Sequence, residues 1–251
     1  MKILVIFLGV ILGIILFLGI VALILFGKLK LAFRKHGYNI NSISDMTDEM
    51  VRIKEENSTQ ARSISGMTSL LKPTIRKDFP DFNENELYSM CELSLRKIFN
   101  AIEEQNNDYV SDMQLIRNSV SNIIEDYKNA NLTVHYDDVE FHQFAIANYE
   151  RKDGMATVTV TTSVGYFFKK MKEEKIIGGD TKFKKQTRYK CEFVYIYDET
   201  KVSSDAKVLA INCPNCGAAI SSLGHKHCEY CGTGVKEVNL KSWELASFEE
   251  Y

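Results

Sequence analysis

The sequence has little net charge, and it lacks internal repeats and long low-complexity segments. Its 251 residues carry a formal net charge of −2, so the chain as a whole has no electrostatic bias towards nucleic acid. It also lacks a glycine-rich phosphate-binding loop. Gly178, Gly179 and Asp180 come nearest to one, but no helix opening with lysine and serine follows them, and two glycines alone indicate a turn. The sequence therefore gives no sign of nucleotide binding of that type.

A long apolar run stands at the start of the chain. No charged residue occurs between positions 3 and 26, and as a helix this run would be about 36 Å long, enough to cross a bilayer core of about 30 Å. A signal peptide is the alternative, but its apolar region would be about half as long and would end at a small-residue cleavage site. The run ends instead at Gly27 and Lys28. We therefore predict a transmembrane anchor over residues 1–27.

The charges around this run predict its orientation. Lys28, Lys30, Arg34 and Lys35 follow it, whereas only Lys2 and the amino terminus precede it. By the positive-inside rule, we expect a single-pass protein of the cell membrane with its carboxyl-terminal domains in the cytoplasm. Residues 28–72 are then a basic juxtamembrane segment followed by a tether rich in serine, asparagine and threonine.

Two Cys-x-x-Cys pairs lie near the carboxyl end, and each is followed by a glycine. They are Cys213 with Cys216, and Cys228 with Cys231. Two intervening residues let one tight turn direct both sulfurs to the same point, and the glycine accepts the positive φ angle of that turn. Disulfides are the alternative, but cytosolic thiols are normally reduced. We predict that the four cysteines bind Zn²⁺ in a zinc ribbon, within residues 206–251. Four thiolates leave no open coordination position, so the zinc is expected to be structural.

Other residues of the predicted ribbon carry less information. His225 and His227 lie beside the second pair and could replace a ligand, but with four cysteines in register we expect them to be loop residues. The ribbon is acidic, which disfavours nucleic acid as a partner. Its lysines from position 213 onwards are Lys226, Lys236 and Lys241, and its acidic residues are Glu229, Glu237, Glu244, Glu249 and Glu250.

Residues 73–205 are predicted to form one domain that begins with helices. Apolar residues recur at steps of three and four from about 83 to 105, and Asn83 with Glu86 forms a capping box at the start of this helix. A second helix is expected to follow directly, with Ser111 and Gln114 as its capping box.

The apolar period then falls to two, which predicts strands. We expect strands from about 133 to 150, from about 155 to 168 and from about 189 to 197. Lys152, Asp153 and Gly154 are expected to connect the first two in a hairpin, because Asp-Gly tolerates positive φ angles. A shift of phase in the first strand predicts a bulge at His142 and Gln143, and hence a curved sheet. Helices followed by antiparallel strands predict an α+β fold.

Several short segments carry a resemblance to a known group. They are Asp-Phe-Pro-Asp-Phe-Asn-Glu at 78–84, the helix end at 99–103, Tyr-Asp-Asp-Val at 136–139, and residues 153–158. Together they resemble bacterial membrane-anchored proteins with a Tim-forty-four-like domain and a carboxyl-terminal zinc ribbon. The resemblance implies a cone-shaped, cystatin-like fold of the nuclear transport factor two type, in which a curved antiparallel sheet wraps long helices. It also implies a scaffold beside a membrane that assists protein transport and contacts lipid or a protein segment. It does not imply catalysis.

A small enzyme is the alternative interpretation of the same domain. Tyr136, Asp138, Glu140 and His142 alternate along one strand, and a carboxylate near a histidine inside an apolar cavity could serve as an acid/base pair. Polar residues at every second position are more typical of the solvated face of a sheet. We therefore expect a membrane-tethered interaction protein with a protein partner rather than an enzyme.

Basic residues are concentrated between positions 167 and 190, interleaved with aromatic residues. We predict that five lysines of this connection contact anionic lipid, and a solubilising loop is the alternative. They are Lys169, Lys170, Lys172, Lys184 and Lys185.

Overall fold

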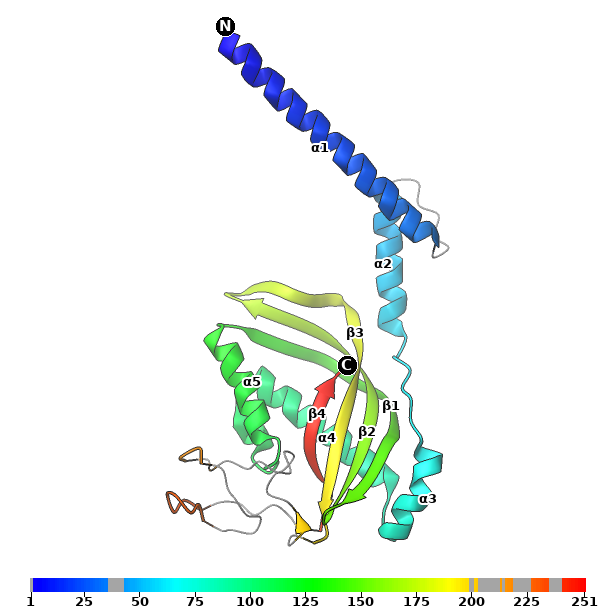
Figure 1. Ribbon diagram of the computed structural model, residues 1–251, viewed down its shortest axis with the longest axis vertical. Coiled ribbons are helices and arrows are strands. Elements are labelled where there is room, and N and C mark those ends of the chain that lie inside the picture. The colour runs from blue at the N-terminus through cyan, green and yellow to red at the C-terminus, as the bar shows by residue number, and fades with distance from the viewer. Residues whose placement is uncertain are drawn as a thin grey trace. The chain divides into compact units, whose positions relative to one another are not determined.

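The computed structural model describes residues 2–35, 43–198, 201–202, 213, 215–218, 227–234 and 241–251, with side chains from position 13 onwards except those of residues 15, 33–35, 43 and 44. It divides into two compact units, Met1–Glu56 and Asn57–Tyr251 (Figure 1). The boundary lies closer to the amino terminus than the start at residue 73 that the sequence suggested.

The first unit contains helix α1 (Lys2–Lys35) and most of helix α2 (Ile43–Thr59). Along α2, Arg52 binds Glu49 at 2.6 Å and Glu56 at 2.8 Å, which are neighbours one helical turn away on either side. The second unit holds all the sequence-predicted site residues outside the anchor.

The prediction of a transmembrane anchor over residues 1–27 is wrong. Among the described residues, no helix has both the length and the apolar character needed to cross a membrane. The predicted single-pass topology, cell-membrane location and cytoplasmic orientation depended on this anchor and are withdrawn with it.

The second unit is built on a four-stranded antiparallel sheet, as the α+β prediction required. Its order is β1 (Thr133–Lys152), β2 (Met155–Lys172), β3 (Lys175–Ile196) and β4 (Glu244–Glu250). Asp153 and Gly154, at φ angles of 49° and 80°, form the predicted first hairpin turn. Strand β4 lies within the range predicted as zinc ribbon, but it belongs to the sheet: the chain returns after the cysteines to pair with β3, with Cys191 opposite Phe248.

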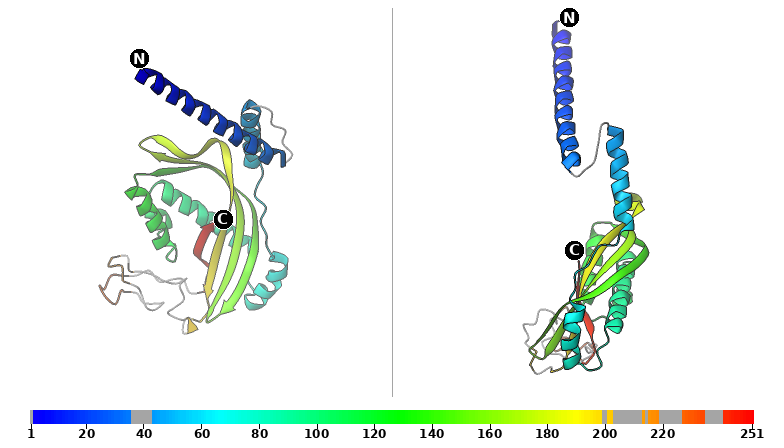
Figure 2. Two further views of the ribbon diagram at one scale, coloured as in Figure 1. Left: turned by 45° about the horizontal axis from the view of Figure 1, so that its top comes forward. Right: turned by 90° about the vertical axis from the view of Figure 1, so that its right-hand side faces the viewer.

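The sheet is strongly curved because β1 is irregular. Its pairing with β2 shifts register between Phe141 and Gln143, which confirms the predicted bulge at His142, and shifts again between Asp137 and Glu140 and between Ile146 and Asn148. Each extra residue bends the strand locally and increases its twist. Figure 2 shows the resulting curved sheet with helices on its concave side.

Two helices, α4 (Glu84–Glu103) and α5 (Arg117–Asn129), fill that concave side. Asn83 caps α4 as predicted, accepting a hydrogen bond from the Asn85 amide at 3.1 Å. The predicted capping box of the next helix is wrong. Ser111 ends a 3₁₀ turn (Asn107–Val110), and the Gln114 side-chain amide donates to the Ser111 carbonyl at 2.9 Å, so α5 begins later.

Aromatic side chains fill the core between the curved sheet and the helices. Phe99 of α4 stacks on Tyr136 of β1 with ring centroids 4.8 Å apart, and it lies 5.6 Å from Tyr166 and 5.5 Å from Tyr189. At this level the tyrosine hydroxyls of Tyr166 and Tyr189 lie 3.3 Å apart, and Tyr189 reaches a carboxylate oxygen of Glu250 at 3.5 Å. The last strand is therefore joined to the core by polar as well as apolar contacts.

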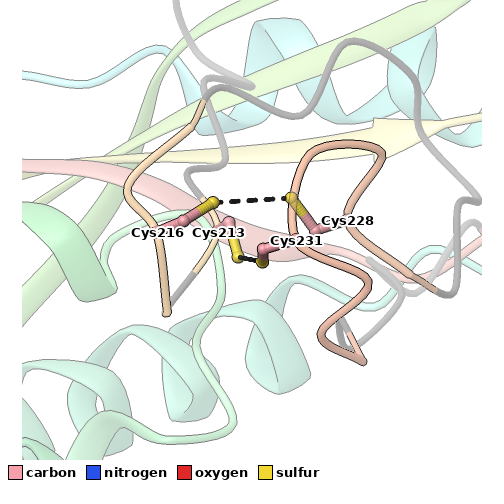
Figure 3. A group of neighbouring side chains, drawn as sticks. All are labelled: Cys213, Cys216, Cys228 and Cys231. Atoms are coloured by element: carbon pink, nitrogen blue, oxygen red, sulfur yellow. Dashed lines mark hydrogen bonds between the residues drawn. The ribbon is translucent and has the colours of Figure 1, made fainter.

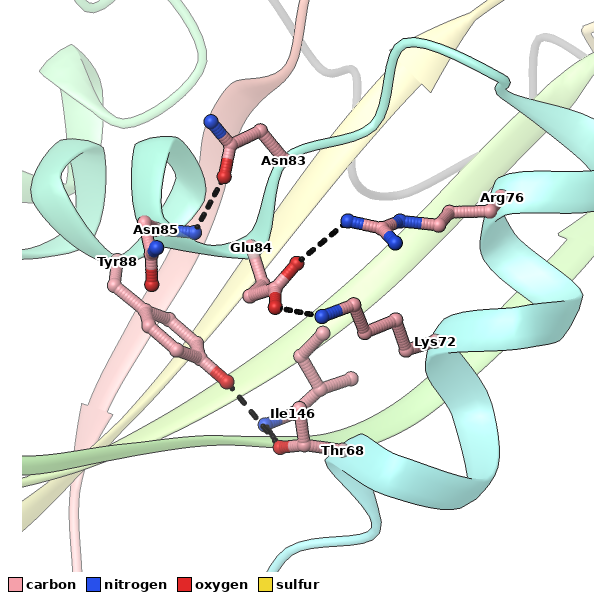
Figure 4. Close-up of polar contacts among 8 residues, drawn as sticks. All are labelled: Thr68, Lys72, Arg76, Asn83, Glu84, Asn85, Tyr88 and Ile146. Carbon is pink, nitrogen blue, oxygen red and sulfur yellow. Dashed lines mark hydrogen bonds and ion pairs between the residues drawn. The ribbon is translucent and has the colours of Figure 1, made fainter.

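Helix α3 (Thr68–Asp78) lies against the corner where α4 starts (Figure 4). Glu84 of α4 binds both Lys72 and Arg76 of α3, the second at 3.4 Å. At the start of α3, the Thr68 hydroxyl accepts a hydrogen bond from the Ile146 amide at 2.8 Å and lies 3.2 Å from the Tyr88 hydroxyl. These contacts fix α3 to both the sheet and α4.

Residues 58–67, which we call the strap, cross the outer face of the sheet. The Gln186 side-chain amide of β3 donates to the Ser58 carbonyl at 2.8 Å, Thr161 of β2 donates to the Ser65 carbonyl at 3.2 Å, and the amide of Met67 donates to the Ile146 carbonyl of β1 at 2.7 Å. The strap thus contacts three successive strands. This explains why the second unit begins near residue 57, within the segment that composition suggested was a tether.

Candidate metal centre

The two Cys-x-x-Cys segments fold into matching turns. In the first, the Gly217 amide donates to the Cys213 carbonyl at 2.9 Å; in the second, the Gly232 amide donates to the Cys228 carbonyl at 2.9 Å. Gly217 and Gly232 have φ angles of 72° and 71°, which side-chain-bearing residues rarely adopt. The glycine after each pair therefore serves the purpose that the sequence suggested.

These turns bring the four thiols into one cluster (Figure 3). All four sulfurs lie within 4.8 Å of one another. Each close contact joins the two turns: Cys213 to Cys231 at 3.5 Å, and Cys216 to Cys228 at 3.7 Å. A tetrahedral ion with metal–sulfur bonds of about 2.3 Å separates its ligands by about 3.8 Å, whereas a disulfide requires about 2.05 Å. The four cysteines are thus arranged so that they could hold a metal ion such as zinc.

The electrostatics of the cluster also suit a cation. The Thr233 side chain, 3.2 Å from the Cys231 sulfur, together with the Thr233 amide lowers the pKa of Cys231 to about 6. The pKa of Cys216 moves the other way, to about 12, because the lowering effect of the Ala218 amide is exceeded by the neighbouring thiols and by desolvation. Thiols this close resist joint ionisation, and a bound divalent cation removes that conflict.

The two histidines near the second pair are not part of this cluster as described. His227 forms an isolated backbone bridge with Gly234, which closes the second turn. His225 lies outside the described residues.

The candidate acid/base residues on β1 do not assemble into a site. Tyr136 points into the core against Phe99, and burial raises its pKa. The bulge after Asp137, with Asp138 at a φ angle of 52°, changes the phase of the strand. Asp138 and Glu140 instead bind Lys184 at 2.7 and 3.0 Å.

His142, the remaining member, lies in the next bulge, where it contacts Gln186 on the exposed side of the sheet at 3.1 Å. The alternation of these four residues predicted that their side chains share one face of the strand. Each bulge adds a residue and so reverses the alternation, which places them on different faces.

The five lysines of the predicted basic connection lie on strands, because β2 and β3 run through it and meet at a turn of Glu173 and Glu174. Three of them form ion pairs: Lys169 with Asp137 at 2.8 Å, Lys184 with β1, and Lys185 with Glu250.

Lys170 lies 5.4 Å from the ring centre of Tyr127, and Lys172 ends β2. The acidic partners come from β1 and β4, which are distant in sequence. Lipid contact through these lysines stays a prediction.

Sequence reasoning missed a cleft of about 580 Å³ at the end of the sheet where β4 begins. The ring of Trp243 lies 5.3 Å from Phe79, 6.0 Å from Phe82 and 5.4 Å from Tyr195, all lining residues. Phe79 and Phe82 belong to the 78–84 segment that carries the resemblance. Trp243 and Tyr195 lie beside them because β4 pairs with β3, and no local sequence pattern predicts that pairing.

No protein-family model matches this chain, and no curated protein matches it. The resemblance to the Tim-forty-four-like group therefore rests on the short segments described above and stays a prediction.

Proposed function

We propose that this chain is an interaction protein whose α+β unit binds a segment of a protein partner, while its four cysteines hold a structural Zn²⁺. The observation that carries the proposal is the aromatic cleft beside Trp243. Aromatic side chains that line a concave surface with a polar rim are typical of the central residues of protein interfaces. Here the rim includes Asp81, Asn83 and Lys241.

The metal supports this function by positioning one wall of the cleft. Trp243 and Lys241 follow the second Cys-x-x-Cys turn and lead directly into β4. Zinc is the metal that best fits four thiolates, and such a set is typical of structural rather than catalytic sites. Holding the two turns together restricts the connection between β3 and β4, and so favours the return of the chain to the sheet.

The proposal is tested by selecting binders for the full-length chain from a random peptide library. We expect selected peptides to bind at least about tenfold more weakly to Trp243→Ala, because truncation of a central aromatic residue removes much of the binding energy. Trp243→Phe keeps an aromatic ring packed against Phe79. It therefore distinguishes a loss of binding caused by a disturbed cleft wall from one caused by the missing indole. Tyr109→Ala is the matched control, because Tyr109 is an exposed aromatic residue outside the cleft. Peptides that bind all four proteins equally would show that the cleft is not the binding site.

A further inference from the structure

The cleft combines aromatic surfaces with carboxylates. Phe79, Tyr195 and Trp243 are only partly buried, so each ring contributes surface that a ligand could meet. The face of an aromatic ring attracts a cation, with Trp the strongest of the natural side chains. This cleft therefore offers the ring type that cation recognition prefers.

Acidic residues predominate among the charged groups that line it. Asp78, Asp81 and Glu86 line the cleft, and Lys241 is the basic residue among its described lining. Asp81 and Glu86 are exposed. The hydroxyl of Tyr149 donates to Asp78 at 2.7 Å, and this hydrogen bond is the largest of the effects that lower the pKa of Asp78. The carboxylate therefore stays charged at neutral pH.

One wall of the cleft already holds a guanidinium group from the protein itself. Arg151 lies over the ring of Tyr197, 4.5 Å from its centre, and donates to Asp78 at 2.8 Å. Both Tyr197 and Asp78 line the cleft. An aromatic face and a carboxylate at this end of the sheet thus bind an arginine side chain within the molecule.

We infer that the cleft recognises an arginine side chain of the partner segment, by placing the guanidinium against Trp243 and Tyr195 with Asp81 and Glu86 as its counter-charges. This inference rests on the proposed function, since it names the side chain that the bound segment presents. Arginine fits better than lysine because its planar group can stack on a ring and donate to a carboxylate at the same time.

The single tryptophan of the chain makes the inference directly testable. Trp243 fluorescence of the full-length protein is followed during titration with acetyl-Gly-Arg-Gly-amide and with the same peptide carrying citrulline, which is nearly isosteric but neutral. We expect a saturable change with the arginine peptide and binding at least about fivefold weaker with the citrulline peptide, which is the range that cation–ring contacts produce.

A double variant, Asp81→Asn with Glu86→Gln, tests the carboxylates. We expect it to lose the preference for arginine, whereas Glu104→Gln with Asp108→Asn, two exposed acidic residues outside the cleft, should keep it. Equal binding of the two peptides to the unchanged protein would overturn the inference, and so would an unaltered preference in the cleft variant.

The peptide selection distinguishes a failure of the arginine inference from a failure of the proposed function. If selected peptides depend on Trp243 but lack arginine, the function stands and the arginine inference falls. If no selected peptide depends on Trp243 and the arginine peptide leaves its fluorescence unchanged, both fall.

Discussion

At the scale of single residues, Gly66 shows how closely the strap approaches the sheet. A Cβ atom built at Gly66 would lie 2.3 Å from the Cβ of Ala145 and 3.2 Å from the Ile146 carbonyl oxygen. These neighbours are the backbone and first side-chain atom of a strand, which cannot move aside cheaply. The strap can therefore lie this close to β1 only because residue 66 has no Cβ atom.

Gly66→Val should separate the strap from β1. We expect a loss of about 1–3 kcal/mol in the free energy of unfolding, which is typical of overpacking, measured by urea denaturation. Gly178→Ala is the control, because its added Cβ would make an ordinary contact of 3.7 Å with Lys170. A Gly66→Val protein as stable as the control would contradict the close approach.

The ion pairs of Glu84 predict a pH dependence. The hydrogen bond with Lys72 is the main cause that lowers the pKa of Glu84 below its ordinary value of 4.5. A lowered folded pKa means that the ionised carboxylate stabilises the fold above about pH 4.5 and that this stabilisation is lost as the pH falls through the folded value. Glu84→Gln should therefore lower the free energy of unfolding by about 1 kcal/mol at pH 7 and by much less at pH 3.

Urea denaturation of both proteins between pH 7 and pH 3 measures this difference. Glu86→Gln on the same turn of α4 is the matched control, since Glu86 is exposed. A stability difference for Glu84→Gln that does not change with pH would refute the assignment.

At the scale of elements, the sequence correctly predicted features that depend on a few neighbouring residues, namely a helix start, a tight turn and a bulge. Asn83 identified the start of α4, Asp153 and Gly154 identified a hairpin, and the phase shift at His142 identified a bulge. The strap, β4 and the aromatic cleft were missed because each depends on residues that meet only after the sheet has formed. Ser111 misled because a capping box requires the following residues to be helical, whereas here a 3₁₀ turn ends at Ser111 and α5 begins only at Arg117.

The two Cys-x-x-Cys turns were predicted best, because each needs only a few consecutive residues. Cys216→Ser should reduce zinc from about one equivalent to less than about half and loosen the two turns, while α4 and the β1–β3 sheet persist, because their core does not involve the four clustered cysteines. Elemental analysis measures the metal and circular dichroism the helices and sheet. Cys91→Ala is the control, because it removes a thiol outside the cluster without burying a hydroxyl and should keep the metal. Purified, freshly reduced parent protein with less than about half an equivalent would contradict the zinc assignment.

At the scale of the whole molecule, the sheet of the second unit is completed by residues that follow the two Cys-x-x-Cys turns. Phe248 and Leu245 of β4 pack in the core, and Glu250 meets Lys185 and Thr187, the second at 2.8 Å. Removal of residues 244–251 should therefore destabilise the entire unit, by more than about 3 kcal/mol, through lost core contacts and an exposed β3 edge.

Urea denaturation followed by circular dichroism measures this loss. Phe248→Leu keeps β4 and most of its apolar volume, so it should cost much less than the deletion. A truncated protein that unfolds at the same urea concentration as the parent would show that β4 is dispensable.

The position of β4 has a consequence for synthesis. A ribosome makes β1, β2 and β3 first and the two cysteine turns next, so during that interval β3 is an open edge with unpaired amides and carbonyls. An edge of this kind is open to pairing with another nascent chain. If the cysteine turns bind zinc as proposed, they do so before β4 is made, and closing that loop shortens the search that brings β4 to its place. Cells depleted of zinc should therefore accumulate this protein as aggregate even where the finished fold is stable.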